Sequence, residues 1–321
     1  MQAGRKRFPE KDRDGEEMGQ VKRYGRKWVA VFWAMAAGLA FQAVPVQATE
    51  VARPAVTASQ LEAEEKAARE FVRQKRYDRA LAVFRALAEK GDPEGDYGLG
   101  LMAARACGMK RNDGMAVAHF RKAAQAGVPE ARYALGTMYD TGRGVRQDIR
   151  QAIVWYERAA AGGNSAAQVR LGTLNLLGRG MPRDYRKAFG WYGRAAKAGD
   201  AKGLYALGMM YIRGWGTPRD LDKATDWIAK AAQARSPEAM HLMGEMAEGG
   251  FGLPRNEKTA LFWYRKGAEG GNRKAMQRLA SACREGALGL PADPVQAKRW
   301  EDKATEAAGK RESLLPVLTA D

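Results

Sequence analysis

Residues 130–163 read EARYALGTMYDTGRGVRQDIRQAIVWYERAAAGG. From Ala131 to Tyr139, apolar residues recur at steps of three and four, which places them on one face of a helix. Gly142 and Gly144 then interrupt this pattern, because glycine allows the positive φ of a tight reversal. A second apolar helical face follows, and a pair of glycines ends it. The stretch therefore predicts a helix hairpin.

The hairpin recurs every 36 residues along the chain. Two ladders mark the step: Gly100, Gly136, Gly172, Gly208 and Gly244, and Trp155, Trp191, Trp227 and Trp263. A fixed period of about 20–50 residues is typical of stacked-repeat proteins. In the last unit Trp300 follows after 37 residues, because the loop from Gly286 to Gly289 holds one extra residue. Since the insertion lies in a loop, we expect both helices of this unit to be intact.

The shared residues of the repeat have physical roles. A mid-helix glycine costs about 1 kcal/mol relative to alanine, so the ladder glycines predict a close approach of the two helices. The ladder tryptophans are predicted to be core residues whose removal costs about 3–5 kcal/mol. A side chain that accepts backbone N–H hydrogen bonds is expected to cap each second helix. These predicted caps are Asn112, Asp148, Asp184, Asp220 and Asn256.

These motifs resemble the Sel-one-like repeat (SLR) family, a relative of the tetratricopeptide repeat (TPR). The stretches ARYALGTMYDTGRGVRQDIRQAIVWYERAAAGG (131–163) and GLYALGMMYIRGWGTPRDLDKATDWIAKAA (203–232) carry the resemblance. It implies an all-α, right-handed α-solenoid of stacked helix hairpins, with about six SLR units after one TPR-like hairpin. Two departures are minor: His119 replaces a ladder tryptophan, and Ala280 replaces a ladder glycine.

The chain divides into five segments. A capping box of Ser59 and Glu62 is expected to open the TPR-like hairpin. The predicted segments are an N-terminal extension plus signal peptide (1–48), a linker (49–58), the TPR-like hairpin (59–91), six Sel-one-like repeats (92–304) and a C-terminal tail (305–321).

The N-terminal segment has the pattern of an export signal. Residues 28–49 carry no charge, basic residues precede them, and small residues at Val46 and Ala48 suit a cleavage site. We predict cleavage after Ala48, a true start at Met18, and a periplasmic mature chain. One alternative is an uncleaved signal anchor in the inner membrane, because the uncharged run has about the 20 residues that cross a bilayer. A cytosolic chain is the other alternative.

The charge is strongly basic. The formal net charge is +17, of which residues 1–48 carry +4, leaving +13 for the mature chain. An exported protein does not meet genomic DNA, so no nucleic acid is expected as a partner. The charge indicates an anionic envelope surface such as phospholipid, acidic glycan or acidic protein. It can equally serve solubility alone.

Residues that carry chemistry are few. The two histidines, His119 and His241, take framework positions and are expected to pack. The two cysteines, Cys107 and Cys283, lie almost five repeats apart, so we predict no disulfide between them. The chain is expected to be a monomer. No phosphate loop, nucleophile elbow or convergent set of carboxylates is present. We therefore predict no catalytic residue, no metal site, no cofactor and no enzyme activity.

The resemblance implies that the first helix of each pair lines the concave side. Counted from the ladder glycine, positions −6, −2, +1 and +5 lie opposite the shared apolar arc and vary between repeats, which indicates a free face. Unmatched apolar residues and arginines on this face are the predicted partner-binding residues. They are Leu101, Arg105, Arg170, Leu177, Met209, Arg213, Leu242 and Arg278. The alternative is that these positions only tolerate variation.

The predicted function is a non-enzymatic periplasmic scaffold or adaptor. It would bind another envelope protein through the concave face of the solenoid, in regulation, envelope assembly or secretion. The alternative is a module that binds an anionic glycan or a membrane surface.

Overall fold

The computed structural model describes residues 57–313, with the side chains of residues 57–308. These residues belong to one compact unit. The predicted extension, the signal peptide and residues 49–56 of the predicted linker lie outside the described residues, as do residues 314–321. No helix within the described part of the chain is long and apolar enough to cross a membrane.

Between residues 57 and 313 the chain forms fourteen α-helices and no strand, which confirms the all-α prediction. The helices are α1 (Ala58–Arg73), α2 (Tyr77–Glu89), α3 (Pro93–Arg105), α4 (Asp113–Gln125), α5 (Pro129–Thr141), α6 (Ile149–Ala161), α7 (Ser165–Leu177), α8 (Tyr185–Lys197), α9 (Ala201–Arg213), α10 (Leu221–Gln233), α11 (Pro237–Gly249), α12 (Glu257–Glu269), α13 (Arg273–Glu285) and α14 (Pro294–Ser313).

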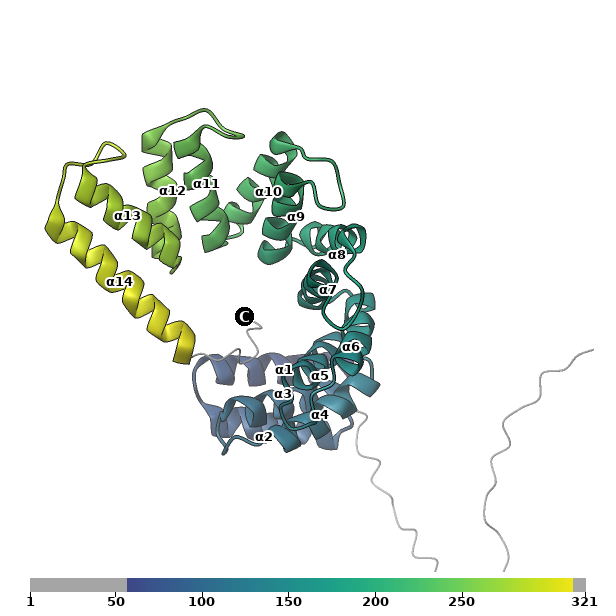
Figure 1. Ribbon diagram of the computed structural model, residues 1–321. Helices are drawn as coiled ribbons and strands as arrows, with labels where there is room; N and C mark the ends of the chain where they lie inside the picture. Colours follow the sequence, from purple (N-terminus) through teal and green to yellow (C-terminus); the bar gives the residue numbers. More distant parts are fainter. Residues whose placement is uncertain (1–56, 314–321) are drawn as a thin grey trace, which may run out of the picture. The chain divides into compact units, whose positions relative to one another are not determined.

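Consecutive helices pack as pairs, and each pair packs on the next, as in a solenoid. We refer to the six pairs from α3/α4 to α13/α14 as units one to six. The row of pairs curves, and in its middle part the first helices α5, α7 and α9 lie on the inner side of the second helices α6, α8 and α10 (Figure 1). On that side α7 also contacts α9 directly. The first and second helices therefore form two different faces.

Side-chain caps fix where the helices begin. All five predicted caps of second helices are confirmed; for example, Asp148 Oδ1 accepts hydrogen bonds from the backbone N–H groups of Arg150 and Gln151. First helices have side-chain caps as well, at Asp92, Asn164, Asp200, Ser236 and Asn272.

The capping box that opens α1 lies two residues before the predicted one. Thr57 Oγ1 accepts from the Gln60 N–H at 3.3 Å, and Gln60 Oε1 accepts from the Thr57 N–H at 2.9 Å. The prediction of Ser59 and Glu62 is wrong, because Ser59 already lies inside the helix. Two boxes with the same spacing overlap here, and the helix uses the earlier one.

The ladder glycines hold the two helices of a unit close together, as predicted. A Cβ atom on Gly172 would lie 2.6 Å from the ring of Tyr192 in the second helix, which is closer than real Cβ atoms approach. Each ladder glycine makes the same kind of contact. The pairs are Gly100 with Phe120, Gly136 with Tyr156, Gly172 with Tyr192, Gly208 with Ile228 and Gly244 with Tyr264.

The prediction that the ladder tryptophans form the core is wrong. The buried residue is the next one in sequence, such as Tyr192 after Trp191, because a step of 100° turns it toward the first helix. The tryptophans are half-buried, and most have a cation over the ring. Arg158 lies 4.7 Å from the centroid of Trp155, Arg194 4.5 Å from Trp191, and Lys230 4.3 Å from Trp227.

Unit six departs from the others in a consistent way. Both of its helices are intact, as predicted from the position of the inserted loop residue. The position that is aromatic in most units is Glu301 here, so no ring presses on the first helix and Ala280 replaces the ladder glycine. Helix α14 continues to Ser313, so residues 305–313 of the predicted tail are helical.

Candidate functional site

The predicted site residue Arg170 takes part in a contact between units two and three. Its Nε donates to Oδ2 of Asp140 in the preceding unit at 3.0 Å. The Asp140 side chain is only 1 % exposed. Its Oδ1 lies 2.9 Å from the Arg179 guanidinium, and the Tyr156 hydroxyl donates to its Oδ2 at 3.2 Å. Arg170 is therefore part of a buried ionic joint between repeats.

Arg278 makes the equivalent contact between units five and six. Its Nε lies 3.0 and 3.1 Å from the two carboxylate oxygens of Glu248, and the Tyr264 hydroxyl donates to Glu248 Oε2 at 2.7 Å. The hydrogen bond from Arg278 holds the pKa of Glu248 below its usual range. Burial raises the pKa of Tyr264. Hence Arg278, like Arg170, links one repeat to the next.

The same two repeat positions are apolar at the other joints. They lie four residues after the ladder glycine of one unit and two residues before that of the next. Leu242 takes the second position between units four and five, where it is 9 % exposed and packs in the same core as Ile212. The prediction that Arg170 and Arg278 lie on a free face is therefore wrong, because position −2 faces the preceding repeat. Leu242 packs against that repeat as well, but it also lines the hollow described below.

The other five predicted residues reach solvent to different degrees. Leu177, at the end of α7, is 65 % exposed, and Arg105 and Arg213 are also exposed. Leu101 and Met209 are half-buried and pack against cores of neighbouring helices. Binding of a partner by any of them stays a prediction.

A hollow of about 850 Å³ lies on the side of the first helices in units four to six. Residues of α9, α11, the starts of α10 and α13 and the far part of α14 line it, along with residues of three loops. Three of the predicted residues meet there: Met209, Arg213 and Leu242. The remaining five, Leu101, Arg105, Arg170, Leu177 and Arg278, do not line it.

The hollow is also lined by residues that were not among the predicted partner-binding residues. Phe251, in the loop after α11, is a partly exposed aromatic residue at its edge. The sequence did contain a signal for Phe251. It is an aromatic residue between the two glycines of its loop, where unit two has Arg143. Tyr205 and His241 occupy the framework position three residues before the ladder glycine and line the hollow too.

Charges of both signs surround this apolar floor. Arg213, Arg219, Arg273 and Lys274 contribute cations, whereas Glu238 and Glu245 contribute carboxylates. The Nδ1 atom of His241 lies 3.6 Å from Glu245 Oε2. Burial lowers the pKa of His241, and Glu245 opposes this effect. The arrangement can bind a chain segment that has apolar side chains and mixed charges.

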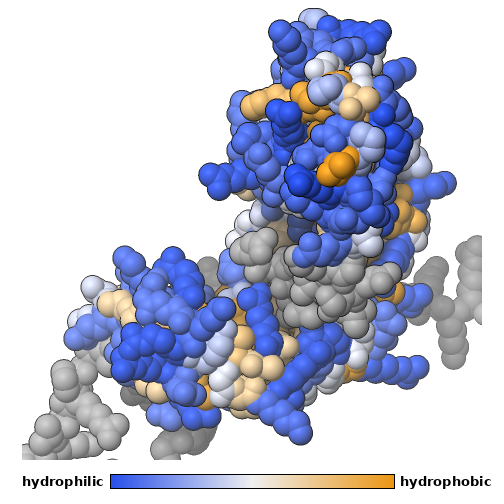
Figure 2. All heavy atoms as spheres, turned by 90° about the vertical axis from the view of Figure 1, so that its left-hand side faces the viewer, coloured by the Kyte–Doolittle hydropathy of each residue, from blue (hydrophilic) through white to orange (hydrophobic). Residues whose placement is uncertain are grey.

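Outside such hollows the visible surface is polar. Figure 2 shows a face on which hydrophilic residues predominate and hydrophobic ones are scattered. Within residues 57–313, no group of three His, Cys, Asp or Glu side chains is placed to hold a metal ion. Scattered apolar residues need no partner, so the hollows are the sites of interest.

Helix pairs that stack in one row, with the first helices on one side and the second helices on the other, define a TPR-like α-solenoid. The family comparison is more specific. The model of the Sel1 repeat matches residues 93–128, 129–164, 165–200, 201–236, 237–272 and 273–308. The chain therefore belongs to the Sel1 repeat family. This is the family that the sequence motifs resemble, there called the Sel-one-like repeat family.

Solved structures agree with this assignment. A Sel1 repeat protein from Oxalobacter formigenes is 32 % identical, with a TM-score of 0.72, over 76 % of this chain and 99 % of that one. The protein c5321, a protective antigen of uropathogenic Escherichia coli with an SLR fold, is 28 % identical, with a TM-score of 0.62. That match covers 81 % of this chain and 58 % of c5321. No curated protein matches the chain.

Sel1 repeat proteins generally act as scaffolds that bind other proteins, and as a class they are generally non-catalytic.

Proposed function

We propose that this chain is an exported, non-catalytic scaffold that binds a segment of a partner protein in the hollow between α9, α11 and α13. The observation that carries the proposal is the hollow itself, where Met209, Leu242 and Phe251 form apolar walls. A protein segment supplies apolar side chains for these walls, together with charges of both signs for the rim.

The mixed charge of the rim favours a protein over a polyanion. Glu238 and Glu245 would repel an anionic glycan or lipid headgroup at this place. The formal charge of +13 on residues 49–321 supports the alternative, binding to an anionic glycan or membrane surface elsewhere on the molecule. Such binding would be lost by about 0.5 M salt, because screening is then short-ranged. A complex based on apolar side chains would persist.

Crosslinking in intact cells tests the binding site. A photoreactive residue at Met209, in the hollow, is compared with one at Asp226, which is exposed on α10 in the row of second helices. We expect a defined protein to be captured from position 209 only, and its capture to fall in a Phe251→Ala variant. Equal capture from position 226, or no effect of Phe251→Ala, would contradict the assignment of the hollow.

The proposed periplasmic location rests on residues 1–48, and the relation to a protective antigen of Escherichia coli supports a place outside the cytoplasm. Cell fractionation with sequencing of the mature N-terminus tests it. We expect a periplasmic chain that begins at Thr49. A membrane-bound chain with an intact N-terminal segment would indicate a signal anchor instead.

A further inference from the structure

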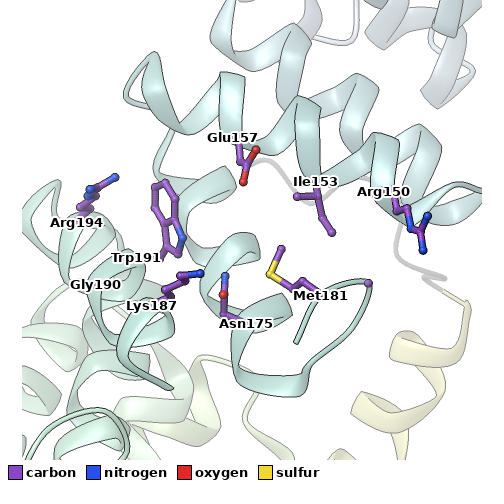
Figure 3. Close-up of a pocket in the computed structure, with 10 residues that line it drawn as sticks. Arg150, Ile153, Glu157, Asn175, Met181, Lys187, Gly190, Trp191 and Arg194 are labelled. Atoms are coloured by element: carbon purple, nitrogen blue, oxygen red, sulfur yellow. The ribbon is translucent and has the colours of Figure 1, made fainter. Parts of the chain in front are cut away.

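A second hollow, of about 660 Å³, lies on the side of the second helices in units two and three. It is lined by α6, α7, α8 and the loop before α8. Figure 3 shows the side chains of Ile153, Met181 and Trp191 around this space, with Asn175 at its floor. It is separate from the hollow of the proposed function, since the two have no lining residue in common.

The hollow lies where unit three lacks the tyrosine that both neighbouring units have; the same repeat position is Ala103, Ala247 and Cys283 in units one, five and six. One repeat later, the ring of Tyr211 fills the equivalent space: it packs edge-on against Phe189 at 5.4 Å, and Lys223 Nζ lies 5.8 Å from its centroid. One repeat earlier, Tyr139 holds the position and also packs in the core. In unit three the residue is Asn175, so the space of a phenol ring is left between Ile153 and Lys187.

The floor and the wall of the hollow are suited to a ring. Asn175 is 3 % exposed, and its Nδ2 donates to the backbone oxygen of Leu171 at 2.8 Å. Beside Trp191, Gly190 stands where Val154 and Phe262 stand in other units, and a Cβ atom on it would meet nothing within 4 Å. Packing therefore does not require this mid-helix glycine, although it costs about 1 kcal/mol. Its absent side chain leaves the entrance open.

The rim of this hollow is predominantly cationic. Arg150, Lys187 and Arg194 line it together with a single carboxylate, that of Glu157. Arg194 lies over the Trp191 ring at 4.5 Å, and Lys187 is 3.7 Å from Asp184. The rim therefore attracts a segment with acidic residues, while the interior is apolar.

We propose that this hollow binds an aromatic side chain, presented by an acidic segment of a partner protein. The partner's ring takes the space that Tyr139 and Tyr211 fill in the neighbouring units. Its flanking carboxylates face Arg150, Lys187 and Arg194. The partner thus completes the third repeat with a side chain that the repeat itself lacks.

Binding of blocked pentapeptides to the full chain tests the proposal. The probe has one tyrosine between two pairs of glutamates; one control peptide has alanine in place of tyrosine, and another has lysines in place of the glutamates. Binding is followed by calorimetry and by the NMR signal of the Trp191 indole N–H. We expect both controls to bind at least about tenfold more weakly than the probe. Equal binding of the alanine peptide would overturn the aromatic assignment and leave a site for anions only.

Variants locate the site. Asn175→Tyr restores the residue of the neighbouring units, so we expect the fold to be kept and the probe not to bind. Gly190→Phe, which copies Phe262 of unit five, blocks the entrance from an exposed helix position. The control Asn175→Ser keeps the space open and should bind the probe within about twofold of the original chain. Unchanged binding to both Asn175→Tyr and Gly190→Phe would refute the proposal.

Discussion

Contacts within a repeat and contacts between repeats follow different rules in this molecule. Within a unit the same steric contact recurs: a glycine of the first helix lies against a large side chain of the second, as Gly172 lies against Tyr192. Between units the chemistry changes, from the ionic Asp140–Arg170 joint to the apolar Ile212–Leu242 joint. Few residues allow two helix axes to lie this close together, so the contact within a unit varies little. A contact between units needs only two complementary side chains, so its chemistry can change from joint to joint.

The largest effect is expected from substitutions in the ionic joint between Asp140 and Arg170. In an Arg170→Leu variant the buried Asp140 carboxylate keeps only Arg179 and the Tyr156 hydroxyl as partners, and we expect a loss of about 3 kcal/mol in the free energy of unfolding. The double variant Asp140→Leu/Arg170→Leu copies the apolar joints, so it should recover most of that loss. Denaturant unfolding of the three chains measures both effects. A double variant as unstable as Arg170→Leu would show that the joints are not interchangeable.

The steric rule predicts opposite effects for two glycines in neighbouring helices. A Cβ atom on Gly172 would press on the Tyr192 ring, and the cost of overpacking outweighs the gain in helix propensity, so Gly172→Ala should destabilise by about 1 kcal/mol. A Cβ atom on Gly193 meets nothing within 4 Å, so Gly193→Ala should stabilise by about 0.5–1 kcal/mol. Thermal unfolding of the two variants separates these outcomes. Equal shifts for both would contradict the rule.

A smaller effect distinguishes the two kinds of joint by pH. Because Arg278 lowers the pKa of Glu248 in the folded state, the ionic joint adds stability above the ordinary pKa of 4.5 and loses it as the pH falls through the lower folded value. The variant Glu248→Leu/Arg278→Leu should therefore lose less stability between pH 5 and pH 3 than the original chain. Unfolding curves at several pH values measure this difference, and parallel profiles would argue against it.

Much of the fold follows from short-range patterns in the sequence. The 36-residue step, the caps and the glycine contact were all predictable, because each depends on residues within one hairpin. The burial of Tyr192 in place of Trp191 was not predicted, although a helical step of 100° separates the two sides. Which of two adjacent aromatic residues faces the first helix depends on the rotation of the second helix about its own axis.

The site was less predictable than the fold. Arg170 and Arg278 were wrongly assigned to a free face because a helical wheel describes one helix and omits the preceding repeat. A signal did exist, since Asp140 with Arg170 and Glu248 with Arg278 are acid–base pairs at the same spacing of 30 residues. The hollow at Asn175 had a signal of the same kind, in a repeat position that is tyrosine in both neighbouring units.

The sequence by itself determined that this chain is a row of helix hairpins with a fixed glycine contact in each, because local periodicity and steric limits act within 36 residues. Only the tertiary structure decided which variable residues join one hairpin to the next and which line an open hollow. The physical reason is that these contacts depend on the offset between successive hairpins, and that offset results from the packing of whole helices against each other.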